Sequence, residues 1–242
     1  MVLSSGTTHM KKNPRSKKDS EFRRILILRT IGNFLVLSTL FVIAKTFYLP
    51  VREEVRYVLD SVSNKRYVVG GPEISDDPEK GGLAKLFQSN AVEILTPEDP
   101  EFSIVVPKIG ANARILPNID ASREDIYLPA LEEGVAHTSG TVFPGEKGHI
   151  FLFAHSTDYF WNVGSYNAVF YLLYKLERGD KVNLFYKGQR YVYQVIGKTV
   201  VDPQEVHYLT RKTTREFLTL QTCWPPGTTL RRMLVFATRV RE

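Results

Sequence analysis

The sequence predicts a mainly β domain with one or two short helices, preceded by a single apolar helix. From residue 101 onward, short runs of β-branched, aliphatic and aromatic residues alternate with turns rich in Gly, Pro, Asn and Asp. Before that point, residues 25–48 form one long apolar segment. Many short strands with few helices indicate a mostly antiparallel barrel or sandwich.

The expected strands can be placed from these runs. They cover residues 103–107, 113–116, 149–154, 181–186, 190–200, 217–223 and 232–240. Residues 149–154 form a continuous apolar run, which is typical of a strand buried on both faces. The turn at 187–189 separates two such runs and predicts a hairpin. Helical spacing of apolar residues predicts a short helix over 166–176, and one helical turn is expected at 129–134.

The region between the apolar segment and the strands is predicted to be a juxtamembrane helix and a linker, over residues 49–100. Apolar residues at helical spacing indicate a helix over 51–63. Residues 64–82 are rich in Gly, Pro and Asp, which favours a linker. The predicted folded domain is therefore residues 101–242.

The positive charge of the chain is confined to its N-terminal part. The formal net charge is +6, but residues 1–47 hold nine basic and two acidic residues, so the rest of the chain is close to neutral. Nucleic-acid binding needs positive charge on the folded surface. The charge distribution therefore argues against a nucleic-acid partner.

The apolar segment at 25–48 is long enough to cross a bilayer, which takes about 20 apolar residues. A basic tail, residues 1–24, precedes it, which by the positive-inside bias places the N-terminus in the cytoplasm and the rest outside the cell. No Ala-x-Ala-type cleavage site follows the apolar core, so an uncleaved single-pass anchor is favoured over a cleaved signal peptide.

Cys223 is the only cysteine in the chain. A lone cysteine excludes an intrachain disulfide and a Cys-based metal cluster. It stands at the end of an expected strand, immediately before Trp224 and a Pro-Pro-Gly turn, where a rigid scaffold meets solvent. The alternative is a buried cysteine that acts as a small hydrophobic residue.

The segment 219–223, Thr-Leu-Gln-Thr-Cys, resembles the TLxTC signature of sortases, the cysteine transpeptidases of bacterial cell surfaces. Two further features are similar to that family. His155 closes the apolar strand at 149–154, and Arg232 opens a strand close to the family's R-x-[ILV]-V-x-A pattern. The resemblance covers roughly residues 101–242 and implies an eight-stranded β-barrel.

The resemblance also implies the roles of three residues. Cys223 would attack a peptide carbonyl to form a thioacyl intermediate, and His155 would protonate the leaving amine and deprotonate the incoming one. Arg232 would hold the acyl oxygen. Thr222 and Trp224, which flank Cys223, are candidates for substrate contact. Packing at the barrel rim explains Trp224 equally well, and Thr222 is better explained as setting the strand geometry.

Other residues compete for these roles. Arg231 neighbours Arg232 and faces the opposite side of the strand, and the family pattern selects Arg232. His149 shares the strand face of His155 and is expected to be structural. His137 and His207 fall in expected loops and are predicted to be solvated, without a role.

No cofactor is expected, because the acidic residues between 202 and 216 are too few to support a calcium site of the kind some sortases have. The Asp-Pro-aromatic plug of pilus-building sortases is absent from the sequence, which leaves the subfamily open. The resemblance implies surface proteins with an LPxTG-like motif as substrates, and a cell-wall precursor amine or a pilin lysine as acceptor. A thiol peptidase on the same scaffold and a non-catalytic, membrane-tethered peptide-binding domain remain as alternatives.

Overall fold

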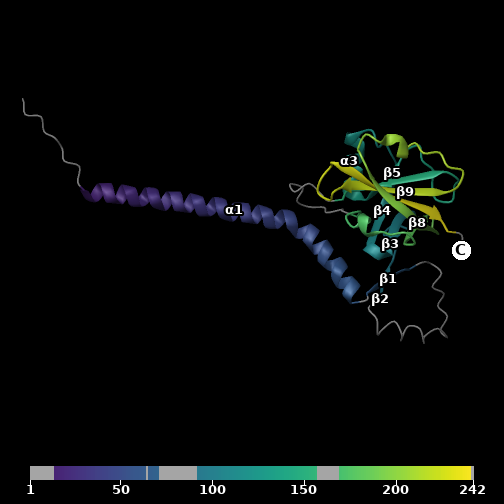
Figure 1. Cartoon of the computed structure of the whole chain (residues 1–242), viewed down its shortest axis with the longest axis horizontal. Coiled ribbons are helices and arrows are strands. Elements are labelled where there is room, and N and C mark those ends of the chain that lie inside the picture. Colours follow the sequence, from purple (N-terminus) through teal and green to yellow (C-terminus); the bar gives the residue numbers. More distant parts are fainter. Residues whose placement is uncertain (1–13, 64, 71–91, 157–168, 241–242) are drawn as a thin grey trace, which may run out of the picture. The chain divides into compact units, whose positions relative to one another are not determined.

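The computed structural model describes residues 14–63, 65–70, 92–156 and 169–240. The chain divides into two compact units, Met1–Leu49 and Pro50–Glu242. Helix α1, Pro14–Val62, begins in the first unit and ends in the second (Figure 1). The helices predicted at 25–48 and 51–63 are thus one continuous helix.

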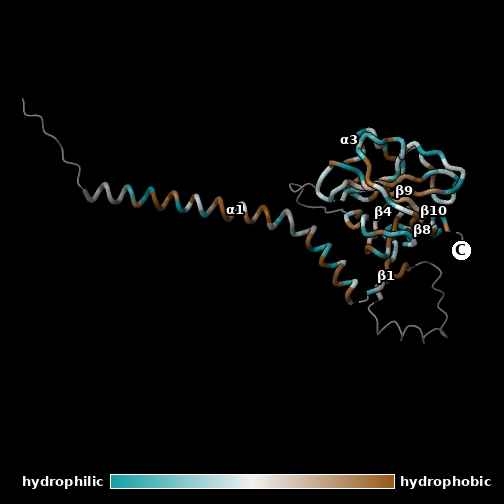
Figure 2. The backbone as a smooth tube through the Cα atoms, viewed as in Figure 1, coloured by the Kyte–Doolittle hydropathy of each residue, from teal (hydrophilic) through white to brown (hydrophobic). Residues whose placement is uncertain are grey.

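The part of α1 that lies in the first unit is apolar. Residues Glu21–Lys45 have a mean hydropathy of 2.0, and the apolar window within them buries none of its residues in the protein. Apolar residues recur along this stretch (Figure 2). By length and composition, this is the one segment of the described chain able to span a membrane.

The second unit is built on a closed, eight-stranded barrel with the strand order β10-β8-β7-β3-β4-β5-β6-β9. Two pairs, β4–β5 and β6–β9, are parallel, and the others are antiparallel. The strands are β3 (Phe102–Val106), β4 (Ala111–Ile119), β5 (Val135–Thr138), β6 (His149–Phe153), β7 (Lys181–Tyr186), β8 (Gln189–Val201), β9 (Phe217–Trp224) and β10 (Arg231–Arg239). The predicted eight-stranded barrel is confirmed.

Alternate side chains of these strands enter two apolar clusters. One face of β6 and β9 contributes Ile150, Leu152, Leu218 and Leu220 to the larger cluster, which fills the barrel. The opposite face contributes Phe151 and other residues to a smaller cluster, which also contains Leu131 of helix α3 (Glu124–Glu133). Strand β6 is therefore buried on both faces, as its continuous apolar run predicts.

Several sequence-based expectations need correction. Strand β5 was not predicted, because its four residues include His137 and Thr138, which do not give an apolar run. The predicted turn at 129–134 is the second half of α3. Within the predicted helix at 166–176, the structure has the short 3-10 helix η3 (Leu173–Lys175), and residues 166–168 lie outside the described chain.

The predicted linker also contains structure. Strand β1 (Arg66–Val69) lies within it, and pairs in parallel with β2 (Val92–Leu95). The hydroxyl of Tyr67 on β1 donates to Asp60 Oδ2 at the end of α1 at 2.6 Å. These contacts join the last turns of α1 to the small parallel pair, within the same unit as the barrel.

Candidate active site

Three adjacent strands, β6, β9 and β10, position the candidate catalytic residues. In the parallel β6–β9 pair, Phe153 lies opposite Gln221, and the backbone N–H of Ala154 donates to the carbonyl of Gln221 at 3.1 Å. The pairing ends there, and His155 follows Phe153 by two residues, just as Cys223 follows Gln221. In the antiparallel β9–β10 pair, Arg232 is the direct partner of Cys223.

Cys223 and Arg232 belong to one face of these strands. Residues directly opposite one another in a sheet project to the same side, and neighbours along a strand alternate. Leu220 and Thr222 point into the barrel, so Cys223 belongs to the outer face. The β9–β10 register assigns Arg232 to that same face, and His155 follows the end of β6 by two residues.

Cys223 is a free, half-buried thiol. Burial is the larger influence on it and raises its pKa, while the positive charge of Arg232 acts in the opposite direction. An ordinary thiol, with a pKa of about 8.5, is only a few per cent thiolate at neutral pH. Cys223 in this structure is therefore predominantly a protonated thiol, and its ionisation depends on the charges around it.

The two candidate arginines occupy different positions. Arg232 lies opposite Cys223, and its Nη1 donates to the carbonyl of Thr229 at 3.0 Å and to that of Arg231 at 3.2 Å. Arg231 lies opposite Trp224, on the other face, and its Nε is 3.8 Å from Asp202 Oδ1. The strand register thus separates the two arginines, with Arg232 on the face of Cys223 and Arg231 on the other.

Thr222 and Trp224 do not lie on the face of Cys223. The side chain of Thr222 is buried, and its hydroxyl donates to the carbonyl of Ala154 at 3.0 Å. This bond ties β9 to the residue before His155, which supports the packing interpretation over substrate contact. Trp224 is half-buried, and its ring lies 5.2 Å from that of Tyr174 between centroids.

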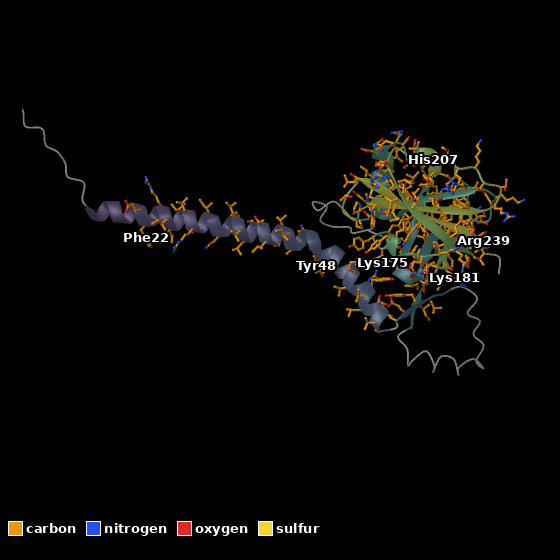
Figure 3. The ribbon with its side chains drawn as sticks, in the orientation of Figure 1. Phe22, Tyr48, Lys175, Lys181, His207 and Arg239 are labelled. Atoms are coloured by element: carbon orange, nitrogen blue, oxygen red, sulfur yellow. The ribbon has the colours of Figure 1, made fainter. Side chains whose placement is uncertain are left out.

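The remaining histidines have different surroundings. His137 is fully buried on β5, which corrects the prediction of a solvated loop, and burial lowers its pKa. Its ring contacts the hydroxyl of Thr141 at 2.9 Å. His207 is exposed on the 3-10 helix η4, Val206–Tyr208 (Figure 3).

His149 is buried at the start of β6, with its Nε2 2.8 Å from the hydroxyl of Thr219 on β9. Burial and the nearby positive charge of Arg211 lower its pKa to about 4. A buried imidazole that is neutral and hydrogen-bonded fits the structural role expected for His149.

Two contacts near the candidate site were not foreseen from the sequence. They are the ion pair of Arg231 with Asp202 and the ring contact of Trp224 with Tyr174. Both join residues far apart in the sequence, and neither partner belongs to a recognisable motif. Among the described residues, no three His, Cys, Asp or Glu side chains come together as a metal site.

A family model described as the sortase domain matches residues 104–240, which is more than half of the chain. The chain belongs to the sortase family. The matched region begins in β3, ends just after β10, and contains Cys223, His155 and Arg232.

Individual proteins are similar to part of this chain, which spans less than two thirds of the curated relative it matches. Sortase D of Bacillus subtilis is 28% identical over 138 residues, which cover 56% of this chain and 61% of that protein. Sortase C-1 from Actinomyces oris is 29% identical, with a TM-score of 0.49 over 71% of this chain and 84% of the other. A pilus-related sortase C of group B Streptococcus is 28% identical, with a TM-score of 0.48 over 58% and 67%.

Proposed function

We propose that the protein is a membrane-anchored cysteine transpeptidase that cleaves an LPxTG-like sorting signal and joins the released acyl group to an amine on the cell surface. The observation that carries the proposal is the strand register: Arg232 pairs with Cys223, and the last β6–β9 pair, Phe153 with Gln221, lies two residues before His155 and Cys223. Membership of the sortase family supports the same chemistry.

The reaction proceeds in two steps. The sulfur of Cys223, as the thiolate, attacks the carbonyl carbon of the scissile peptide bond, and an S–C bond forms. The C–N bond then breaks, and the leaving amine takes a proton from the imidazolium of His155. In the second step, the acceptor amine attacks the thioacyl carbon and gives its proton to His155, so that the thiolate is regenerated.

Arg232 supplies a permanent positive charge beside this reaction. In both steps, negative charge develops on the acyl oxygen, and a fixed guanidinium lowers the energy of that state. The same charge favours the thiolate of Cys223 over the thiol, against the effect of burial. One side chain thus serves the nucleophile before the attack and the oxyanion after it.

The N-terminal part of the chain acts as the anchor in this proposal. Residues 1–24 form a basic cytoplasmic tail, 25–48 cross the membrane, 49–100 connect, and 101–242 form the catalytic barrel outside the cell. The hydroxyls of Thr30 and Thr39 donate to the carbonyls of Leu26 and Leu35, within the helix. Such internal bonding lets polar groups lie in a lipid environment without unsatisfied donors.

One assay tests the proposal against its alternatives. The full chain in detergent micelles is incubated with a labelled LPxTG-type peptide and either a glycine or a lysine amine. We expect a transpeptidation product and a thioacyl adduct that Cys223→Ala abolishes. Cleaved peptide without ligation would instead make the protein a thiol peptidase, and no adduct at all would make it a non-catalytic binding domain.

A further inference from the structure

The last turns of helix α1 contact the 3-10 helix η3, which follows β6 by about 20 residues in the sequence. The carboxylate of Glu54 accepts a hydrogen bond from the hydroxyl of Tyr174 and lies 3.2 Å from Nζ of Lys175. Lys175 (labelled in Figure 3) also stacks over the rings of Tyr57 and Tyr174. One acidic side chain of α1 therefore holds two consecutive residues of η3.

A second contact joins η3 to a strand of the barrel. Nζ of Lys198 on β8 donates to the backbone carbonyl of Tyr174. Tyr174, Tyr57 and Trp224 all pack against the large apolar cluster inside the barrel. Tyr174 is thus fixed at its hydroxyl by α1 and at its backbone by β8, and its ring contacts Trp224.

Trp224 is the last residue of β9 and follows Cys223 directly. Its side chain projects to the opposite face from the thiol, so it does not share the reacting face. Because the two residues are consecutive in one strand, the packing of the indole fixes the backbone from which the thiol projects. Movement of Trp224 against Tyr174 would carry Cys223 with it.

We propose that Glu54, acting through Tyr174 and Trp224, is a positioning residue for the Cys223 thiol. The inference rests on the proposed function, because it assigns to the end of the membrane helix a part in aligning the nucleophile with His155 and Arg232. The connection has three links. A charge-assisted hydrogen bond joins Glu54 to Tyr174, a ring contact joins Tyr174 to Trp224, and the peptide bond joins Trp224 to Cys223.

The first test replaces Glu54 by Leu in the full chain in detergent micelles. We expect kcat for the LPxTG-type peptide to fall about threefold to tenfold, because only part of the energy of the lost charge-assisted hydrogen bond reaches the thiol through the connection. KM should stay unchanged, because no contact in the connection lies on the outer face. Glu54→Gln, which keeps an oxygen to accept from Tyr174 and loses the charge, should restore part of kcat.

The matched control is Glu93→Gln. Glu93 on β2 forms an ion pair with Lys65 at 2.5 Å. Its substitution thus removes a similar acidic contact from the same N-terminal region without affecting η3. Its kcat should equal that of the wild type. Equal losses in Glu54→Leu and Glu93→Gln would show a general weakening of the N-terminal region and would overturn the proposal.

A double substitution tests the route. In a Trp224→Leu background, Glu54→Leu should have little further effect on kcat, because the connection is already broken. A loss of undiminished size in that background would mean that Glu54 acts by another route, and the proposal would fail. A merely stabilising role for Glu54 would persist in both backgrounds.

Alkylation by iodoacetamide gives a readout that needs no enzymatic activity. Cys223 is the only cysteine of the chain, so the rate reports on one thiol. Loosening the end of β9 should expose this half-buried thiol and raise the rate about threefold to tenfold in Glu54→Leu, and not in Glu93→Gln. An unchanged rate in Glu54→Leu would contradict the positioning role. If the wild type forms no thioacyl adduct, the proposed function fails, and this rate alone decides the positioning.

Discussion

Two histidines at opposite ends of one strand have opposite surroundings. His149 begins β6 and His155 follows its end, six residues later on the same face. His149 is buried against Thr219, and burial with the charge of Arg211 lowers its pKa to about 4. His155 is half-buried, two residues beyond the last β6–β9 pair, Phe153 with Gln221.

The difference between them lies in burial along one strand pair. At the start of the pair, the hydroxyl of Thr219 faces an imidazole that stays neutral. At its end, the thiol of Cys223 lies four residues further along β9, and both Cys223 and His155 are half-buried. The same side chain thus occupies a buried and a half-buried position, and we expect only the second to reach a substrate.

The largest expected effect comes from substitution of His155. His155→Ala removes the group that transfers the proton to the leaving amine, and we expect kcat/KM to fall about 10²- to 10⁴-fold. The rate of transpeptidation of the labelled peptide measures this fall in kcat/KM. His149→Gln, at the other end of the strand, should keep activity near that of the wild type at pH 7. A comparable loss in both variants would remove the functional distinction between the two histidines.

The next largest effect is expected for Arg232→Ala, which should lower kcat by about 10²- to 10³-fold. Its charge now lowers the pKa of Cys223 against the effect of burial, so its removal should raise that pKa further. Less thiolate would then be present at pH 7, and alkylation by iodoacetamide should slow.

Arg231→Ala is the matched control for that variant. Arg231 belongs to the other face, and its exposed ion pair with Asp202 contributes at most about 1 kcal/mol. We expect kcat to change by less than about threefold. Equal losses in the two variants would show that the strand register does not determine which arginine serves the reaction.

A smaller effect is expected at His149, and it concerns stability. The folded protein holds this side chain neutral, with a pKa of about 4 against an ordinary value of 6.5. Because the folded pKa is depressed, the contribution to stability is complete above pH 6.5 and is lost as the pH falls toward 4. The loss amounts to at most about 3 kcal/mol.

Urea unfolding of the Pro50–Glu242 unit at several pH values measures this contribution. His149→Gln, which does not titrate, should lose less stability between pH 6.5 and 4 than the wild type does. Parallel pH profiles for the two proteins would mean that protonation of His149 is not coupled to folding.

The sequence predicted the barrel well where strands are apolar and failed where they are short or polar. Strand β6 was evident from its continuous apolar run, and its five residues are all buried in the structure. Strand β5 was missed, because a buried His137 looks polar in a sequence and only its hydrogen bonds make its burial possible. Strands β1 and β2 have four residues each, and their pairing spans a Gly- and Pro-rich segment.

The sequence could propose residues for the candidate site, but it could not give their arrangement. Cys223, His155 and Arg232 could be named from the TLxTC resemblance and strand positions. The family pattern already favoured Arg232 over Arg231, but its place opposite Cys223 follows only from the register of β9 and β10, a long-range property that no local pattern contains. The same holds for Thr222, whose inward orientation follows only from its place in the barrel.

The smallest expected effect is that of Thr222→Val, which keeps the shape of a β-branched side chain and removes its hydroxyl. The lost bond to the carbonyl of Ala154 should destabilise the protein by about 1 kcal/mol, as a single buried hydrogen bond does. Because Ala154 precedes His155, loosening this point should also lower kcat a fewfold without a change in KM. Thr219→Val, at the closed end of the strand pair, removes the partner of His149 and should cost stability while leaving kcat unchanged. A loss of kcat in Thr219→Val as large as that in Thr222→Val would mean that the two ends of the strand pair are not functionally separate.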